Sequence, residues 1–309
     1  MGDLIFNRIA IIGVGLIGGS IARAALEQGV VGEIMLFDGD PQALVRAGEI
    51  GFGKPAATIT DAVATADAVF HCVPVGAMGA TARASIHAMK PGAILTDVGS
   101  VKGNVARDFR SLGRTDIHVI PGHPIAGTEK SGPDAGFASL FDGRWCIITP
   151  EQGGSPDYVA ATDRLAAFWT ALGSKVERMD AQRHDLVLAV TSHLPHLIAY
   201  NMVATAYDME AVTEGEVVKF SAAGFRDFTR IAASDPTMWR DVFLNNKEAV
   251  LEVLGRFEED LTALRKAIRN GDGQKLFDTF TESRRIRREI IDAGQDTAAA
   301  NFGRDKPKP

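Results

Sequence analysis

The chain has 309 residues and a formal net charge of −6, and its composition is 46% hydrophobic and 23% charged. These proportions are typical of a folded soluble protein; they argue against disorder and a membrane protein, and the negative charge argues against a nucleic-acid partner. The length exceeds what one hydrophobic core usually organises, so we expect two domains.

The N-terminal segment and the cysteines favour a cytoplasmic protein. MGDLIFNRIAIIG runs directly into a strand pattern, without the charged and apolar regions of a signal peptide, and no apolar stretch reaches bilayer-spanning length before a charge or turn interrupts it. Cys72 and Cys146 lack the spacing of a metal site or a redox pair. We therefore expect a reducing compartment and no membrane segment.

From the N-terminus to residue 179, apolar strand-like runs alternate with helical segments. The runs are IAIIG, EIMLFD, ADAVFHCVPV, GAILTD, DIHVIPG, RWCIITP and KVERM. This alternation predicts a parallel, doubly wound α/β sheet in a domain spanning residues 1–179. The orientation of the last two runs is left open by the pattern.

A glycine-rich turn follows the first apolar run. RIAIIGVGLIGGS places Gly13, Gly15 and Gly18 in a GxGxxG pattern between a strand and a helix, with Leu16 and Ile17 inside the turn. The first glycine permits a tight turn, the second lets the backbone approach a pyrophosphate, and the third allows close helix packing. The segment predicts a Rossmann-type dinucleotide site.

Asp38 ends the second run, about twenty residues past the last glycine, where a carboxylate accepts hydrogen bonds from a ribose diol. The same carboxylate would repel a 2′-phosphate, and the following Gly39 and Asp40 offer no arginine to hold one. We therefore expect NAD rather than NADP as the cofactor.

Two further runs bring reactive side chains to the carboxyl edge of the predicted sheet. His123 follows DIHVIPG, and its imidazole suits the removal of a hydroxyl proton near neutral pH. Ser100 and Lys102 follow GAILTD in DVGSVKG. Ser100 either orients the imidazole or the reacting alcohol, or caps a helix that begins near Val101; the two roles are compatible.

After residue 179 the strand patterns give way to long helical periodicities, which predict a separate all-helical domain over residues 180–294. Gly271 and Gly294 stand where helix C-terminal caps would fall. The tail, residues 295–309, lacks apolar periodicity and is predicted to be mobile.

Two polar motifs stand out in this helical half. In TSHLPHLIAY, His193 and His196 share a helix face around Pro195, and HLPH lacks the glutamate of HExxH, so we favour substrate contacts over a metal site. In GFRDFTRIA, Arg226 and Arg230 lie at helical spacing in a segment expected to be partly buried. Arg230 suits a substrate carboxylate, and Arg226 suits an internal pair with a carboxylate such as Asp227 or Glu129.

Taken in order, GVGLIGGS, DVGSVKG, HPIAGTEKSGPDAGF, SHLPH and GFRDFTRIAASDPTMW cover nearly the whole chain. In this series the sequence closely resembles the prephenate/arogenate (cyclohexadienyl) dehydrogenase family of tyrosine biosynthesis. The resemblance implies a Rossmann-type N-terminal domain, a helical C-terminal domain that forms a homodimer, and NAD-dependent oxidative decarboxylation of prephenate or arogenate.

The resemblance also implies roles for single residues. His123 would accept the hydroxyl proton, Ser100 would be its hydrogen-bonding partner, and Arg230 would bind the ring carboxylate. The residues that would line or gate the pocket are His196, Thr128, Glu129 and Trp239. Arg226 stands where some relatives have lysine, so its contact is left open.

Two alternatives remain at this stage. A 3-hydroxyacid dehydrogenase or an imine reductase also joins a Rossmann-type domain to a helical one, and turnover of prephenate would separate them from the family above. A non-catalytic NAD sensor is less favoured, because His123, Ser100 and Arg230 are all present.

Overall fold

The computed structural model describes residues 4–128, 130–210 and 216–292. By internal contacts the chain divides into two compact units, Met1–Leu251 and Glu252–Pro309. The first unit therefore holds both sheets and the helices up to residue 251. The domain boundary expected at residue 179 stays a prediction.

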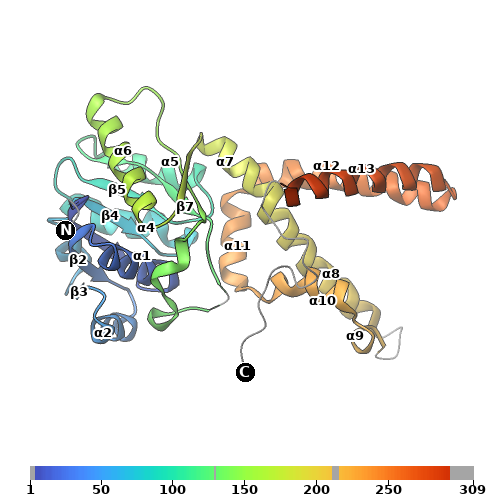
Figure 1. The fold of residues 1–309 in the computed structure, drawn as a ribbon, viewed down its shortest axis with the longest axis horizontal. Coiled ribbons are helices and arrows are strands. Elements are labelled where there is room, and N and C mark those ends of the chain that lie inside the picture. Colours follow the sequence, from blue (N-terminus) through green and yellow to red (C-terminus); the bar gives the residue numbers. More distant parts are fainter. Residues whose placement is uncertain (1–3, 129, 211–215, 293–309) are drawn as a thin grey trace. The chain divides into compact units, whose positions relative to one another are not determined.

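The main sheet has six strands in the order β3-β2-β1-β4-β5-β6, and every neighbouring pair is parallel. This is the order of a doubly wound dinucleotide-binding sheet, so the Rossmann-type prediction is confirmed (Figure 1). Its strands are β1 Phe6–Ile12, β2 Val31–Phe37, β3 Lys54–Pro55, β4 Ala68–His71, β5 Ile94–Asp97 and β6 His118–Val119.

Helices cover both faces of this sheet. Residues 9–12 of β1, which point alternately to opposite faces, are therefore all buried. Ile9 and Ile11 of β1 pack into one core cluster, whereas Ala10 and Ile12 pack into the other. The first cluster includes α1 (Leu16–Glu27) and α6 (Pro156–Ala171). The second includes α4 (Val75–Ser85), α5 (Gly103–Ser111) and α11 (Pro236–Asn245).

A second, three-stranded sheet contains β7 (Gly122–Pro124), β8 (Trp145–Ile148) and β9 (Lys175–Arg178). β7 and β8 are antiparallel, and β8 and β9 are parallel, which answers the question of orientation that the sequence left open. The run DIHVIPG is thus divided between two sheets, with β6 in the first and β7 in the second. His123 lies on β7, directly past the carboxyl edge of the main sheet.

A long helical run follows the second sheet, with α7 over Ala181–Leu188 and α8 over Leu194–Glu210. The turn between them, Ala189–His193, is a π-helix. Pro195 has no N–H and its ring would clash with an α-helical carbonyl four residues earlier, so the ladder widens by one residue at this point. By length and composition alone, the helical run Ala181–Met209 is long and apolar enough to cross a membrane.

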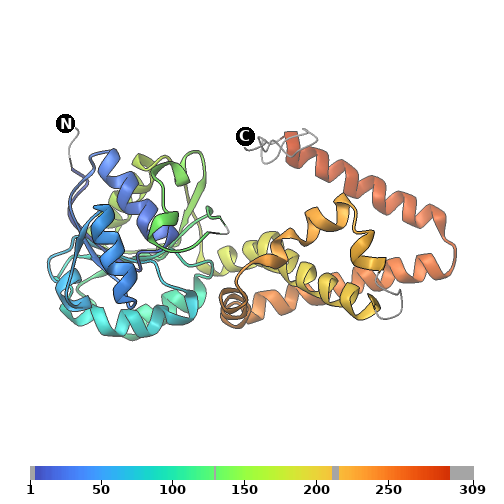
Figure 2. The same ribbon diagram turned by 90° about the horizontal axis from the view of Figure 1, so that it is seen from below.

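The remaining elements are short connecting helices and two long C-terminal ones (Figure 2). The connecting α-helices are α2 Pro41–Ile50, α3 Ile59–Val63, α9 Glu216–Lys219 and α10 Ala223–Thr229. The 3₁₀ turns are Ile86–Ala88, Pro133–Ala135, Ala138–Phe141 and Arg230–Ala233. The long helices are α12 Lys247–Arg269 and α13 Gly273–Asp292.

Two features of the helical half bear on the sequence predictions. Gly271, at φ +65°, follows the end of α12, as expected for a C-terminal cap, whereas Gly294 and the expected tail lie outside the described residues. The helical pattern over residues 237–271 is divided in the structure by Asn246, which lies between α11 and α12. Its side chain is buried and enters the site described next.

Candidate functional site

The glycine-rich turn joins β1 to α1 at the carboxyl edge of the main sheet. Gly13 has φ +102°, and a Cβ there would lie 2.4 Å from the carbonyl oxygen of Cys72, so only glycine fits. A Cβ on Gly18 would lie 2.0 Å from the carbonyl oxygen of Gly13. A Cβ on Gly15, by contrast, would meet no atom within 4 Å, which leaves its backbone open to a ligand.

The start of α1 fits a phosphate group. Gly15 is its N-cap and supplies no side-chain hydrogen bond, so the first N–H groups, next to Leu16 and Ile17, are not capped by that residue. At the end of β2, the Asp38 carboxylate accepts hydrogen bonds from the Val14 N–H (2.8 Å) and the Asp40 N–H (2.9 Å). Asp38 is therefore held beside the turn, where a ribose-binding carboxylate is expected.

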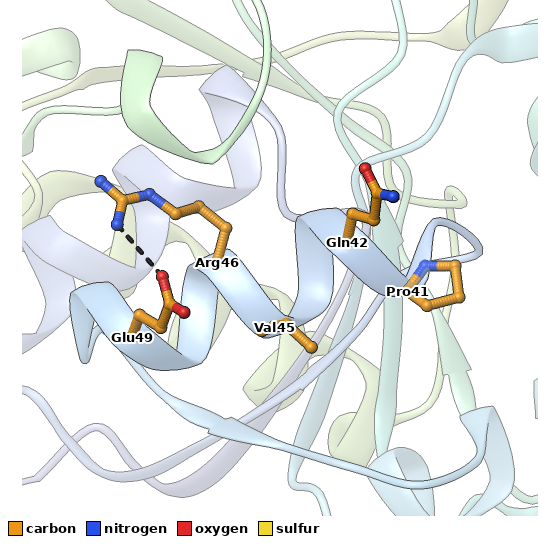
Figure 3. Close-up of a pocket in the computed structure, with 5 residues that line it drawn as sticks. All are labelled: Pro41, Gln42, Val45, Arg46 and Glu49. Carbon is orange, nitrogen blue, oxygen red and sulfur yellow. Dashed lines mark hydrogen bonds and ion pairs between the residues drawn. The ribbon is translucent and has the colours of Figure 1, made fainter.

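A shallow hollow is lined by residues of α2, the helix that follows Asp38 in the sequence (Figure 3). Its only charged lining residues are Arg46 and Glu49, whose side chains lie 3.2 Å apart. Arg46 also contacts Asp134 at 2.6 Å. Because these charged side chains pair with one another, the hollow supplies no unpaired charge that could bind a ligand or transfer a proton. Its lining residues are Pro41, Gln42, Val45, Arg46 and Glu49.

A fully buried ion pair lies beneath the turn that leads to His123. The Lys102 ammonium contacts the Asp97 carboxylate at the end of β5 and donates to the Gly122 carbonyl oxygen at 2.7 Å. The Gly122 N–H donates to the other Asp97 oxygen at 3.3 Å. Burial lowers the pKa of Lys102 and raises that of Asp97, opposed in each case by the partner. The pair fixes the backbone immediately before His123.

His123 is buried, and its imidazole contacts a second buried imidazole. Its Nδ1 lies 2.9 Å from Nε2 of His184 on α7, and Nδ1 of His184 lies 2.9 Å from the Asp185 carboxylate. The pKa of His123 lies well below the usual imidazole value, first because burial disfavours the charged form and then because His184 and Lys102 are close. His123 is therefore neutral at physiological pH and able to accept a proton.

Asp185 also binds the start of α5. Its two carboxylate oxygens accept the N–H groups of Lys102 (2.7 Å) and Gly103 (2.8 Å). The expected N-cap role of Ser100 was wrong, because α5 begins at Gly103 and the caps come from a distant helix. Ser100 is half-buried, and within the described residues its hydroxyl makes no hydrogen bond with His123, whose Nδ1 faces His184 instead.

Asn246 extends the network to the SHLPH segment. Its side-chain N–H donates to the Asp185 carbonyl oxygen at 2.8 Å and lies 3.0 Å from Nδ1 of His193. Since Nδ1 of His193 accepts, its proton is on Nε2, a buried atom that makes no hydrogen bond of ordinary geometry in the described part of the chain, although the Ser100 backbone lies close enough to act on the pKa of this ring. Burial lowers the pKa of His193 to about 4. A buried donor of this kind suits a bound ligand.

His196 and Trp239 form the next contact in the same direction. Their rings stack with centroids 3.6 Å apart, and Nδ1 of His196 donates to the Ser192 carbonyl oxygen at 2.8 Å. The Trp239 indole N–H is buried without a partner in the residues that the structure covers. Burial lowers the pKa of His196, and the nearby Arg230 charge acts in the same direction. Arg230 thus lies close enough to His196 to affect its charge.

Both arginines of GFRDFTRIA are exposed, so the expected partial burial was wrong. α10 has no buried residue and contacts α8 and the 3₁₀ turn Arg230–Ala233. Within the described residues Arg226 makes no hydrogen bond or ion pair with Asp227, and Glu129, the other expected partner, lies outside them. Neither guanidinium has a hydrogen-bond or ion-pair partner within the described residues. Thr128 is exposed on the loop after β7, where its hydroxyl accepts the Lys130 N–H at 3.2 Å.

Sequence reasoning missed three of the residues that complete this network: His184, Asp185 and Asn246. All three are buried polar residues, two in α7 and one between α11 and α12, and polar groups in such positions require partners. The signal was the pair His184-Asp185 on the otherwise apolar face of a predicted helix. The doublet Asn245-Asn246 inside a long helical pattern was a second signal, because asparagine is a poor residue for a helix interior.

Comparison with known proteins adds independent support for these motifs. The family model described as prephenate dehydrogenase, nucleotide-binding domain, matches residues 21–178, and the model described as prephenate dehydrogenase, dimerization domain, matches residues 180–282. The chain belongs to the prephenate dehydrogenase family. Within this family it is 42% identical over 284 residues to a cyclohexadienyl dehydrogenase of Zymomonas mobilis, a match that covers 92% of this chain and 96% of that protein.

Further members are similar in sequence and in fold. A prephenate dehydrogenase of Bacillus subtilis is 31% identical over 91% of this chain and 75% of its own length. The crystal structure of the A. aeolicus prephenate dehydrogenase in complex with hydroxyphenyl propionate and NAD⁺ superimposes with a TM-score of 0.85, at 34% identity, over 92% of this chain and 98% of that one. The family prediction made from the five motifs is therefore confirmed.

Proposed function

We propose that this chain is an NAD-dependent cyclohexadienyl dehydrogenase, which converts prephenate to 4-hydroxyphenylpyruvate, arogenate to tyrosine, or both. The observation that carries the proposal is the buried, neutral imidazole of His123, placed past the carboxyl edge of a dinucleotide-binding sheet. Membership of the prephenate dehydrogenase family supports the substrate class.

The residues around the glycine-rich turn fit NAD. The open backbone at Gly15 and the start of α1 suit the pyrophosphate, while Asp38 suits the ribose diol and disfavours a 2′-phosphate. Bound NAD supplies the acceptor for the hydride that leaves the ring carbon. Leu16 and Ile17 complete the turn, and Gly13 and Gly18 keep it tight enough to leave that space.

His123 removes the proton of the ring hydroxyl. The O–H bond breaks, its electrons form the new carbonyl, and the imidazole takes the proton as the hydride leaves. Because burial keeps His123 neutral, it is ready to accept. Loss of the ring carboxylate as carbon dioxide is driven by aromatisation of the ring.

Arg230 binds the ring carboxylate of the substrate. It is an exposed guanidinium without an internal partner among the described residues, and it acts on the charge of His196. A carboxylate accepts two parallel hydrogen bonds from a guanidinium, so Arg230 fixes the ring as well as its charge. His196 and Trp239 provide the stacked wall beside it.

The remaining pocket residues are assigned to the substrate. We assign substrate contacts to His193 through its unpartnered Nε2, and to Ser100 near the reacting hydroxyl. The motif resemblance extends the same role to Thr128, Glu129 and Arg226. We also propose a site without a metal ion, since the described residues contain no group of three or more His, Cys, Asp or Glu side chains that could hold one.

We further propose that the chain forms a homodimer through its helical half. Residues 180–282 match a dimerization-domain model, and large apolar side chains of α12 and α13 are exposed in the single chain. Burying such a surface against a second copy is the usual way to remove it from water. The exposed apolar residues are Leu261, Ile268, Phe277, Phe280, Ile286 and Ile290.

A cytoplasmic enzyme with a small-molecule substrate, and with no nucleic-acid or membrane partner, is consistent with these features. Cys72 and Cys146 are free thiols, as a reducing compartment maintains them. The acidic net charge of −6 disfavours nucleic acid.

The test is turnover by the purified chain with prephenate and with arogenate, each with NAD and with NADP, followed through the absorbance of the reduced cofactor and the release of carbon dioxide. We expect carbon dioxide and reduced NAD in equal amounts with at least one substrate. Reduction without carbon dioxide would favour a simple hydroxyacid dehydrogenase. Tight NAD binding with no turnover of either substrate would favour a sensor.

A further inference from the structure

The side chains of His123, His184 and Asp185 form one continuous chain of hydrogen bonds from β7 to α7. The two imidazoles are joined at 2.9 Å, and the second imidazole joins the carboxylate at 2.9 Å. His184 is fully buried, and His123 and Asp185 are less than a tenth exposed. Water therefore competes little for these bonds, and their direction is set by the groups themselves.

The direction of the chain follows from what surrounds Asp185. Both of its oxygens face backbone N–H groups, of Lys102 and Gly103, which can only donate. These groups form the start of α5, where the helix dipole favours a negative charge, and the Lys102 ammonium adds a positive one nearby. Asp185 is thus an ionised acceptor toward His184.

An accepting carboxylate determines which nitrogen of each ring carries the proton. Nδ1 of His184 must donate to Asp185, so Nε2 of the neutral ring has the free electron pair. Nδ1 of His123 must then donate to that pair. The remaining nitrogen of His123, Nε2, is left unprotonated, as a proton acceptor requires.

We propose that His184 and Asp185 are positioning residues that hold His123 in the tautomer whose Nε2 accepts the substrate proton. The proposal rests on the proposed function, because it concerns the base of that reaction. His184 supplies the acceptor for Nδ1 of His123, and Asp185 fixes the orientation and the proton of His184.

The same chain stabilises the charge that forms during the reaction. When the hydroxyl proton moves to Nε2, its former bonding electrons stay on the substrate oxygen and His123 becomes positive. Of the charged or titratable groups near His123, protonated His184, Lys102 and His193 oppose that charge. The neutral His184 that donates to Asp185 does not. Asp97 is occupied by Lys102, so Asp185, acting through His184, is the carboxylate that offsets it.

A purely structural role for these residues is the competing explanation, since Asp185 also caps α5. The variants are therefore placed at His184, which makes no cap. His184→Leu removes the acceptor for His123, whereas His184→Gln can supply an amide oxygen to the same N–H. His118→Gln is the matched control, because His118 is a half-buried histidine against Tyr158, outside the network.

We expect His184→Leu to lower kcat by about 100-fold, the lower end of what a positioned base supplies, with substrate and NAD KM changed little. His184→Gln should recover at least tenfold of that loss, and His118→Gln should match the wild type. Equal kcat values for the Leu and Gln variants would overturn the acceptor role, as would a Leu variant within twofold of the wild type.

The tautomer itself is measured by ¹⁵N NMR on the full-length, histidine-labelled protein, with the signals assigned by single substitutions. We expect Nδ1 protonated and Nε2 unprotonated in both His123 and His184, and a mixture of tautomers at His123 in His184→Leu. A proton on Nε2 of His123 in the wild type would overturn the proposal. This result needs no turnover, so it separates failure of the chain from failure of the proposed enzyme activity.

Discussion

The glycine-rich turn and the buried imidazole network perform neighbouring tasks but are built in different ways. The turn is made by consecutive residues, and its contacts are backbone contacts, such as the carbonyl of Cys72 against Gly13. The network joins residues up to 83 positions apart through side-chain hydrogen bonds, as between Lys102 and Asp185. A backbone site is therefore recorded in a local motif, whereas a side-chain network becomes visible only after folding.

The difference predicts how each region responds to mutation. In the turn, a change of shape should disturb cofactor binding before it disturbs chemistry. In the network, replacing a hydrogen-bonding side chain should lower kcat and leave NAD affinity unchanged.

The largest effect is expected at the centre of the network. His123→Asn should lower kcat by about 10³-fold, within the range that a general base supplies, because no other group at this position accepts the hydroxyl proton. Steady-state kinetics measures the loss, and NAD titration by calorimetry serves as the control. A variant that keeps more than a tenth of the wild-type kcat would show that another group is the base.

Arg230→Ala should act on substrate capture. Removal of a charge-assisted bidentate contact should raise the substrate KM by about 10- to 100-fold, since hydrogen bonds to charged groups contribute roughly 1.5–3 kcal/mol. The measurement is KM and kcat for both substrates, with Arg240→Ala as a matched control on α11, whose guanidinium pairs with Asp241. An unchanged KM would reject the anchoring role.

Gly13→Ala tests the turn. The new Cβ would meet the Cys72 carbonyl at 2.4 Å in a backbone conformation of positive φ, so the loop must shift. We expect NAD affinity to fall about tenfold or more, since a non-glycine residue in such a conformation costs on the order of 1–2 kcal/mol before the clash is counted. Gly29→Ala, with φ +65° and no atom within 4 Å, separates strain from the clash. Equal NAD affinity in both variants would contradict the close-approach argument.

Asp38→Asn should have a smaller effect on choice of cofactor. Loss of the charge weakens the ribose contact and removes the repulsion of a 2′-phosphate, so the NAD-to-NADP ratio of kcat/KM should fall by about tenfold, equivalent to roughly 1.4 kcal/mol. The ratio is measured under saturating substrate. If it does not change, Asp38 serves only to hold Val14 and Asp40.

The smallest change is expected on acidification. The reaction needs neutral His123, and its pKa is held well below 6.5 by burial, so kcat should stay constant as the pH falls through 6.5. A pH profile of kcat, with protein stability monitored alongside, checks this. A loss of activity with a midpoint near 6.5 while the fold remains intact would indicate a solvated imidazole.

The fold and the nucleotide end could be predicted because their determinants are local. Period-two apolar runs give the strands, and GxGxxG in its strand-to-helix context gives the turn. His123 could be located at the sheet edge from the end of one run. The division of that run between β6 and β7 could not be predicted. It depends on two separate pairings, of β6 with β5 and of β7 with β8, and β8 begins only at Trp145.

The partners of His123 could not be predicted for the same reason. Ser100 was chosen because it follows a predicted strand that ends at the same sheet edge and because of the family resemblance. His184 reaches His123 because α7 packs across the start of α5. The exposure of Arg226 and Arg230 could not be predicted from the sequence either. An apolar segment indicates that its side chains are buried, but it does not say whether the surface that buries them belongs to the same chain.

The π-helical turn at Ala189–His193 makes the spacing of the SHLPH segment a matter of residue count. A π turn holds one residue more than an α turn, and each residue of an α-helix rotates the chain by about 100°. Deleting one residue here would restore a regular backbone ladder, yet it would rotate His196 away from Trp239 relative to His184. The π-helical turn therefore sets the rotation of α8 relative to α7 about the helix axis. Insertions or deletions across it should be far less tolerated than substitutions.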